Sequence, residues 1–361
     1  MKIGVPKEIK NLEFRVGLNP SSVSNLILAG HIVFVEKNAG IGSNFSNEDY
    51  LQVGAIILDS AKEIYENAEL IIKVKEPQAS EIQFINAQHT IFSYFHFASD
   101  PQLLTSLLAS GATCIAFETV ELEDHSLPLL IPMSEVAGRL ATQNGANLLL
   151  KHQGGKGKLM GGVPGVEPAV VTILGAGIVG LHAAEMAAGL GAKVYLLDKN
   201  LSRIRQLSQI IPSNIQLLFS SDSTIKDLLP RTDLLIGAVL IPGLKAPHLV
   251  KRVDLKLMEK GSVIVDVAVD QGGCIETIHA TTHENPTYII DGIIHYGVAN
   301  IPGSVPITST NALNNAILPY VELIAKHGWD RACQLNSALS KGLSISNGEV
   351  IDIRLNSLKL I

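Results

Sequence analysis

The segment GAGIVG at residues 175–180 has the glycine spacing of a loop that binds the pyrophosphate of a dinucleotide. A β-rich run from Val170 to Leu174 precedes it, and helical spacing follows from Leu181 to Leu190. In such a loop the first glycine permits a tight turn, the second lets the backbone approach the anion, and the third lets the helix pack on the strand. The helix N-terminus then faces the pyrophosphate. Glycine-rich turns are common, so the loop alone predicts only a dinucleotide fold.

Asp198 makes this prediction more specific. It lies at the end of the next predicted strand, Lys193 to Leu197. A carboxylate at that place accepts a hydrogen bond from a ribose 2′-hydroxyl and repels a 2′-phosphate, which favours NAD over NADP. Arg203 lies nearby and could soften the preference. The alternative is a structural strand-helix-strand unit with an unrelated acid.

Three more polar residues follow predicted strands, and in doubly wound sheets ligands bind beyond the carboxyl ends of the strands. Lys75 follows the strand 69–74, His96 follows the strand 91–95, and Asp270 follows the strand 263–269. Each has a structural alternative. Lys75 could be a solvated surface lysine, His96 a packing residue, and Asp270 a turn cap.

A nicotinamide enzyme that acts on an amino acid needs three kinds of group. A fixed cation must hold the substrate carboxylate, and Arg15 or Lys75 could supply it. An acid/base group must also exchange protons at the amine and the carbonyl, and His96 is the natural choice. Asp270 could position water or ammonia and stabilise an iminium ion. The sequence shows no nucleophile constellation, and its histidines lack close metal-ligand spacing.

The composition excludes several other classes of protein. A net charge of −6 and the absence of basic runs argue against nucleic acid and against an anionic membrane surface. The three cysteines are too few and too widely spaced for a disulfide framework or a zinc site, which favours a reducing compartment. Charges near Met1 argue against a signal peptide, and polar residues within the apolar stretch 169–197 argue against a spanning helix. We therefore expect a cytoplasmic protein.

Short β-branched runs alternate with helical stretches, which is typical of an α/β protein. A length of 361 residues favours two domains. We expect two doubly wound parallel-sheet domains, the second a Rossmann dinucleotide-binding domain inserted into a discontinuous first domain. Residues 1–130 would begin a substrate or catalytic domain, residues 131–306 would bind NAD, and residues 307–361 would return to the first domain as helices. Ser134 is the predicted N-cap of a long helix that ends near His152.

With these residues identified, the sequence resembles the alanine dehydrogenase family over essentially its full length. The resemblance rests on segments 11–16 (NLEFRV), 73–77 (KVKEP), 132–139 (PMSEVAGR), 160–166 (MGGVPGV), 266–273 (DVAVDQGG) and 298–300 (VAN). It implies the reversible oxidation of L-alanine by NAD and water to pyruvate, ammonia and NADH. It also implies a homohexamer, and no nucleic-acid or membrane partner is expected.

The resemblance assigns roles to individual residues. His96 and Asp270 would be catalytic, Arg15 and Lys75 would hold the substrate, and Met133 and Asn300 would border the substrate and nicotinamide. The NAD site would comprise Ser134, Gly175, Gly177, Ile178, Val179, Gly180, Asp198, Arg203, Ser220, Val239, Leu240, Val267, Ala268, Val269, Asp270, Val298, Ala299, Asn300 and Ile301.

Three positions depart from the family pattern. Arg203 stands where the family can carry lysine, and His279 stands where some members place arginine near the cofactor. Leu323 stands where some members carry an acidic metal ligand, so we expect no bound metal.

Two other readings compete with this one. The chain also resembles the NAD-binding subunit of proton-translocating transhydrogenase, which needs no amino-acid pocket; the segments around Lys75 and His96 favour the alanine enzyme. A protein that only senses NAD, or keeps the fold as a scaffold, would have lost the pocket residues. Arg15, Lys75, His96 and Asp270 are all present.

Overall fold

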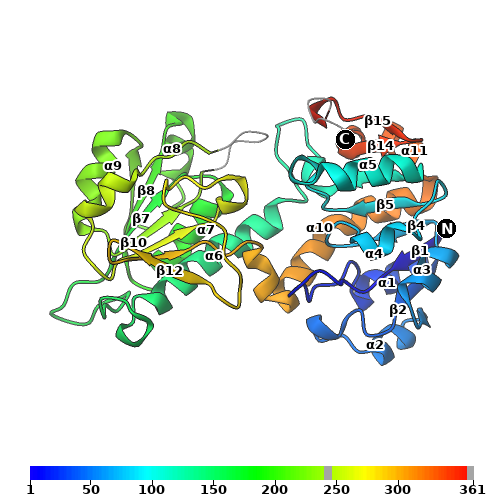
Figure 1. Cartoon of the computed structure of the whole chain (residues 1–361), viewed down its shortest axis with the longest axis horizontal. Coiled ribbons are helices and arrows are strands. Elements are labelled where there is room, and N and C mark those ends of the chain that lie inside the picture. Colours follow the sequence, from blue (N-terminus) through cyan, green and yellow to red (C-terminus); the bar gives the residue numbers. More distant parts are fainter. Residues whose placement is uncertain (240–245, 356–361) are drawn as a thin grey trace. The chain divides into compact units, whose positions relative to one another are not determined.

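The chain forms two compact units in a computed structural model that describes residues 1–239 and 246–355 (Figure 1). The first unit consists of Met1–Met133 and the chain from Gly303 onward, and the second consists of Ser134–Pro302. The change from one unit to the other falls within α6 (Ile131–Leu148). This helix begins before Ser134, so the prediction of Ser134 as its N-cap is wrong. A turn in which the amides of Leu130 and Ile131 donate to Leu127 leads directly into the helix, and Pro132 is tolerated in its first turn.

The first unit is built on an eight-stranded sheet with the order β15-β14-β6-β5-β4-β1-β2-β3. From β6 to β3 in this order, each strand is parallel to the next. Successive side chains of a strand point to opposite faces, so each strand contributes to two apolar clusters. In β4, for example, Leu70 and Ile72 belong to one cluster and Ile71 belongs to the other.

The elements of the first unit up to β6 alternate strand and helix. They are β1 (Lys2–Val5), α1 (Pro20–Leu28), β2 (Ile32–Glu36), α2 (Asn47–Gln52), β3 (Ile56–Leu58), α3 (Ala61–Asn67), β4 (Leu70–Ile72), α4 (Ala79–Ile82), β5 (Thr90–Ser93), α5 (Pro101–Ser110) and β6 (Thr113–Ala116).

The C-terminal segment does more than return as helices, which corrects the sequence-based prediction for residues 307–361. The helices α10 (Pro306–His327), α11 (Trp329–Leu335) and α12 (Ser337–Gly342) are followed by β14 (Leu343–Ser346) and β15 (Glu349–Val350). β14 pairs antiparallel with β6, and β15 pairs antiparallel with β14. Asn347 and Gly348 both have positive φ, as a two-residue hairpin turn requires. The Asn-Gly pair was the local signal for these strands.

The second unit contains a seven-stranded sheet with the order β12-β13-β11-β10-β7-β8-β9. Its elements are β7 (Val170–Leu174), α7 (Ile178–Gly189), β8 (Lys193–Asp198), α8 (Leu201–Leu207), β9 (Ile215–Phe219), α9 (Asp222–Leu228), β10 (Leu234–Gly237), β11 (Val263–Asp266), β12 (Thr287–Ile290) and β13 (Ile293–Tyr296). All neighbours are parallel except β12 and β13.

The strand order reverses direction at β7, because the chain runs from β7 through β8 to β9 on one side and resumes at β10 on the other. This switch point lies where doubly wound sheets bind ligands. The expected fold class, two predominantly parallel α/β sheets, is confirmed, with antiparallel edge strands added to both. Among the described residues, no helix combines the length and apolar character needed to cross a membrane.

Candidate active site

The glycine-rich loop joins β7 to α7 at the switch point of the second sheet. Gly175 has a φ of +98°, and a Cβ atom there would lie 2.7 Å from the carbonyl oxygen of Ala238. A Cβ atom on Gly180 would lie 1.8 Å from the carbonyl oxygen of Gly175. These two glycines are therefore required by the turn and by the close packing of helix and strand. A Cβ atom on Gly177 would meet nothing within 4 Å, so this residue faces open space.

The first turn of α7 can receive an anion. Its N-cap is Gly177, which has no side chain that could cap the first amides of the helix. The backbone amides that open a helix need partners from outside it, and with the helix dipole they favour a phosphate group. Ile178 and Val179 supply these amides. The loop thus fits the pyrophosphate of a dinucleotide.

Asp198 lies at the end of β8 beside this loop. Its Oδ2 accepts a hydrogen bond of 2.7 Å from the amide of Ala176, and its Oδ1 accepts one of 2.7 Å from the amide of Asn200. A carboxylate can accept about four hydrogen bonds, so ribose hydroxyls could still be accommodated. Arg203 donates from Nε to the carbonyl oxygen of Ala176 over 2.9 Å.

A hollow of about 250 Å³ opens at this place. It is lined by Ala176, Gly177, Asp198, Asn200, Ser202, Arg203 and Gln206. A carboxylate, a glycine backbone and small polar side chains suit a ribose in contact with the loop. The Arg203 guanidinium on the same wall would soften the repulsion of a 2′-phosphate.

Asp270 does not stand directly at a strand end, which corrects the predicted strand 263–269. β11 ends at Asp266, and Asp270 is an exposed residue in a short 3₁₀ turn, Val269–Gln271. The strand ends early because the Asp266 carboxylate takes over the backbone amides beyond it. It accepts hydrogen bonds from Ala268 (2.9 Å), Cys274 (2.7 Å) and Ile275 (3.1 Å).

Asp266 thus joins the two ends of the loop that carries Asp270. Burial raises the pKa of Asp266 to about 6, against the opposing effect of the three amides. The signal in the sequence was a single acid inside an apolar strand. That this acid binds both ends of the loop was not predicted from the sequence.

The other predicted cofactor residues lie in the second unit as well. Ser220 follows β9 and donates its amide to the carbonyl oxygen of Asp198. Val298 is buried, Asn300 has a φ of +58°, and Ile301 begins a 3₁₀ turn. Val239 follows the strand β10, and Leu240 lies outside the described residues. Ser134 lies inside α6.

Lys75 is a buried cation that forms no ion pair with any residue that the structure describes, unlike the buried Arg15 and Lys73. It follows β4, its side chain is buried, and within residues 1–239 and 246–355 its ammonium group makes no hydrogen bond or ion pair. Burial, and then the positive charges of Arg15 and Lys10, lower the pKa of Lys75. An anion beside this ammonium group would relieve an unfavourable charge. Lys75 is therefore not the solvated surface lysine of the alternative interpretation.

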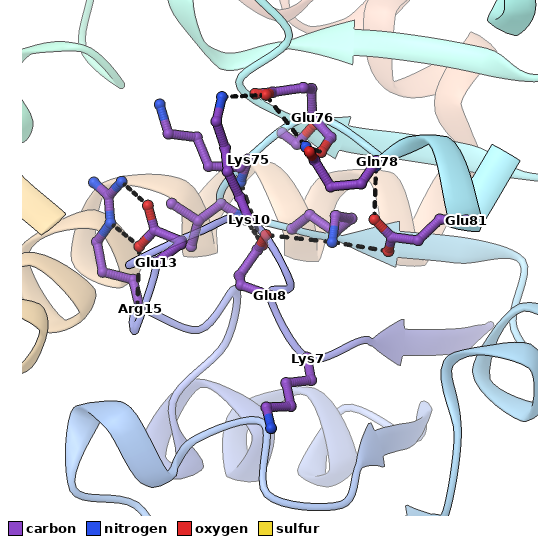
Figure 2. Close-up of polar contacts among 12 residues, drawn as sticks. Lys7, Glu8, Lys10, Glu13, Arg15, Lys75, Glu76, Gln78 and Glu81 are labelled. Atoms are coloured by element: carbon purple, nitrogen blue, oxygen red, sulfur yellow. Dashed lines mark hydrogen bonds and ion pairs between the residues drawn. The ribbon is translucent and has the colours of Figure 1, made fainter. Parts of the chain in front are cut away.

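Arg15 is also buried, but Glu13 neutralises it. The guanidinium donates from Nε to Glu13 Oε1 over 2.6 Å and from Nη2 to Glu13 Oε2 over 2.5 Å, as Figure 2 shows. Burial alone would lower the pKa of Arg15, but these contacts with Glu13 raise it. Nη1 lies 3.1 Å from the sulfur of Met133. The structure therefore brings Arg15 and Met133 together and fixes the guanidinium in one orientation.

His96 follows β5 in a left-handed backbone conformation, with a φ of +51°. Glu118 holds this turn, because its Oε1 accepts hydrogen bonds from the amides of Phe95 (3.1 Å) and His96 (2.6 Å). The imidazole is nearly half exposed, stacks parallel to the Tyr94 ring, and places Nδ1 4.0 Å from Glu118 Oε1. A partly exposed imidazole beside a carboxylate can exchange a proton with a substrate.

The structure gathers part of the predicted site in each unit. Arg15, Lys75, Met133 and His96 belong to the first unit, and Asp270, Asn300 and the dinucleotide loop belong to the second. Glu13 and Glu118 were missed as supporting residues. Glu118 could have been found by the same strand-end rule, because it follows β6, the parallel neighbour of β5.

A metal site is not evident in the described part of the chain. No three His, Cys, Asp or Glu side chains within residues 1–239 and 246–355 group closely enough to hold a metal ion.

Comparisons with known proteins show the family of the chain. Residues 4–137 match the family model "Alanine dehydrogenase/PNT, N-terminal domain", and residues 141–352 match "Alanine dehydrogenase/PNT, C-terminal domain". The chain is 54% identical to an alanine dehydrogenase of Methanococcus maripaludis, over 97% of this chain and 94% of the relative. It is 52% identical to the alanine dehydrogenase of Bacillus subtilis, over 97% of this chain and 92% of the relative.

Solved structures give the same result. An L-alanine dehydrogenase structure superposes with a TM-score of 0.96 at 50% identity, covering 99% of this chain and 98% of the other. A transhydrogenase from Sinorhizobium meliloti has a TM-score of 0.82 at 24% identity, covering 98% and 99%. The second likeness shows a shared fold only.

Proposed function

The chain belongs to the alanine dehydrogenase/PNT family, and on that premise we propose that it catalyses the reversible NAD-dependent oxidative deamination of L-alanine. In this reaction L-alanine, NAD and water give pyruvate, ammonium, NADH and a proton. The relatives that carry the name alanine dehydrogenase are about half identical to this chain over nearly its full length, which favours this activity over that of a transhydrogenase subunit.

Lys75 and Arg15 are proposed to hold the substrate carboxylate. The observation that carries the proposal is the buried Lys75 ammonium, which forms no ion pair with a carboxylate of the described residues and whose charge Glu76 and Glu13 offset only in part. A substrate carboxylate would supply that balance. Because Glu13 already fixes and neutralises Arg15, the guanidinium would serve mainly as a set of oriented N–H donors. Met133, in contact with Arg15, would border the substrate methyl group.

His96 and Asp270 are proposed to manage the protons. His96, held by Glu118 and stacked on Tyr94, would exchange a proton with the water that attacks the substrate carbon and with the hydroxyl formed there. Asp270, on the loop tied by Asp266, would position the water or ammonia and stabilise positive charge on the substrate nitrogen.

The second unit is proposed to bind NAD. When bound, NAD would accept the hydride of the substrate. Gly175, Gly177, Ile178, Val179 and Gly180 would receive the pyrophosphate, and Asp198 with Arg203 would receive the adenosine ribose. Ser220, Val239 and Leu240, the loop 267–270, the segment 298–301 and Ser134 would complete the site. We further propose a homohexamer in the cytoplasm, as implied by the family.

The direct test is formation of NADH by the purified protein with L-alanine and NAD. We expect absorbance at the NADH wavelength to rise only when both are present, and pyruvate to accumulate in equal amount. Reduction of an NADP analogue by NADH without alanine would instead support a transhydrogenase subunit. Tight NAD binding with neither activity would support a protein that only senses NAD, and either result would refute the proposal.

A further inference from the structure

A buried acid at the start of the chain contacts the backbone that presents Lys75. Glu8 is almost fully buried. Its Oε1 accepts hydrogen bonds from the amide of Val74 (2.6 Å) and from the amide of Lys75 (3.3 Å). Figure 2 shows Glu8 among the polar contacts that surround it. These amides lie just beyond the end of β4, and their acceptor is the Glu8 side chain instead of a neighbouring strand. A side chain distant in sequence therefore fixes the path of the chain at Lys75.

The same carboxylate is anchored on its other side. Glu8 Oε2 lies 3.3 Å from the ammonium nitrogen of Lys73, which is completely buried. Lys73 also lies 3.0 Å from Glu81 Oε1, and that oxygen accepts a hydrogen bond from the hydroxyl of Tyr65. Lys73 thus joins two acids into one buried network.

This network holds both ends of the turn that carries Lys75. Glu8 binds the entry of the turn at Val74, and Glu81 Oε2 accepts a 2.8 Å hydrogen bond from the amide of Gln78 at its exit. Between these points lie only residues 75–77, the last of them Pro77, which restricts the backbone further. A turn fixed at both ends leaves its side chains little freedom to shift with the backbone.

We infer that Glu8 is a positioning residue for the Lys75 ammonium group, acting through the backbone amides of Val74 and Lys75. The inference rests on the proposed function, in which Lys75 holds the substrate carboxylate. It assigns Glu8 no contact with the substrate. Its effect is to place the Lys75 ammonium where a carboxylate bound beside Arg15 can reach it.

The charges around Glu8 agree with such a role. The groups that face it are Lys73, Glu13, Glu81, Arg15 and Tyr65. Lys73 balances only one of the two acids it contacts, and burial raises the pKa of Glu8 to about 7. A neutral Glu8 keeps one oxygen that can accept from the Val74 amide. Positioning therefore requires the acceptor oxygen more than the charge.

This distinction defines the experiment. Glu8→Ala removes the acceptor, whereas Glu8→Gln keeps an acceptor oxygen at the same distance along the side chain. In the full-length enzyme we expect Glu8→Ala to raise the KM for L-alanine on the order of tenfold, equivalent to losing one strong hydrogen bond. Glu8→Gln should restore most of the wild-type KM, and the KM for NAD should stay unchanged in both variants.

Asp233→Ala is the matched control. Asp233 is another buried acid that accepts a backbone hydrogen bond, 2.7 Å from the amide of Val170, and pairs with Lys158 over 2.8 Å. It immediately precedes β10 and belongs to the second unit, whereas Lys75 belongs to the first. We expect this variant to lose stability without a change in the KM for L-alanine. An equal rise in that KM in Asp233→Ala would overturn the inference, because general destabilisation would then explain the effect.

A second readout needs no substrate. Hydrogen exchange at the Val74 and Lys75 amides should be faster in Glu8→Ala than in Glu8→Gln or in the wild type. If the wild type forms no NADH with alanine, the proposed function fails, and exchange still decides the role of Glu8. A wild-type KM together with protected amides in Glu8→Ala would overturn the inference.

If that variant does not fold, Glu8→Asp, whose shorter side chain displaces the acceptor, must show the raised KM instead. A wild-type KM in Glu8→Asp would also overturn the inference.

Discussion

Lys75→Met should raise the KM for the substrate without weakening the fold. The substitution replaces a buried ammonium group, which lacks a carboxylate partner among the described residues, with a flexible apolar side chain of similar length. Because burial and the charges of Arg15 and Lys10 oppose the charged form, its removal should leave the free energy of unfolding unchanged or raise it by roughly 0.5–2 kcal/mol at pH 7.

The effect on activity follows from the lost contact. A hydrogen bond between charged groups contributes about 1.5–3 kcal/mol. Since 1.4 kcal/mol corresponds to a factor of ten, the KM for L-alanine or pyruvate should rise by roughly 10- to 100-fold. NAD binding should not change, because the dinucleotide loop lies in the second unit.

Lys73→Met, two residues away, should have the opposite effect on stability to Lys75→Met. Lys73 is buried even more completely and contacts Glu8 and Glu81, so its replacement leaves two buried acids without their cation. Breaking such an ion pair from one side destabilises a fold by roughly 3–5 kcal/mol. The two lysines should therefore respond in opposite directions to the same substitution.

The pH dependence of stability tests independently whether the charged form of Lys75 destabilises the fold. The pKa of Lys75 is lower in the folded chain than its usual 10.5, so as pH rises towards 10.5 the folded state gives up this proton before the unfolded state does. Wild-type stability should therefore gain from this group with rising pH. Lys75→Met should lack that gain, so its advantage should shrink towards pH 10.5.

Denaturant unfolding of the NAD-free variants and steady-state kinetics with alanine measure these effects. A loss of stability in Lys75→Met as large as that in Lys73→Met would refute the idea of an uncompensated ammonium. An unchanged KM would refute its contact with the substrate.

Three further substitutions test the rest of the site. His96→Ala should lose nearly all turnover, because the proton carrier is gone. It should still bind the cofactor, measured as NADH by fluorescence titration, because the loop of the second unit is untouched. Asp198→Ala should weaken NAD more than NADP, measured by their KM values, because the acceptor for the ribose hydroxyl and the repulsion of a 2′-phosphate disappear together. Gly180→Ala should destabilise the protein by roughly 1–3 kcal/mol in chemical unfolding, since the new Cβ atom would lie 1.8 Å from a backbone oxygen.

Each of these has an outcome that contradicts it. Substantial turnover by His96→Ala would remove this residue from the proton transfer. Equal weakening of both cofactors in Asp198→Ala would mean that its hold on the Ala176 amide matters more than any ribose contact. For Gly180, the control is Gly177→Ala, whose Cβ atom meets nothing within 4 Å; similar losses of stability in both would contradict the packing argument.

Part of the fold could be predicted because its signals are local. The glycine spacing, the β-rich runs around it and the acid at Asp198 lie within about thirty residues, which is one strand-helix-strand unit. Strand ends were less accurate. The predicted strand through residue 269 ends at Asp266, because the carboxylate of that residue binds the amides beyond it. The strands β14 and β15 were missed, although their Asn-Gly turn was present in the sequence.

The sequence by itself determined the types and the order of the groups that could do chemistry. A cation at residue 75, an imidazole at residue 96 and a carboxylate at residue 270 each follow an apolar run, and hydrophobic patterning alone is enough to predict that order. The residue types also limited the chemistry to proton transfer and anion binding, because no nucleophile constellation was present.

Only the tertiary structure decided which of these charged groups is neutralised by an ion pair. In the segment Lys73-Val74-Lys75 the two lysines look alike. Glu8 and Glu81 form ion pairs with the first, whereas the second forms no ion pair within the described residues and its charge is offset only in part. Glu8 is far from both in sequence, and periodicity carries no information about a contact made through the fold. Coulomb energy depends on distance in space and on burial, so the residue suited to hold a substrate anion is distinguished only after the chain has folded.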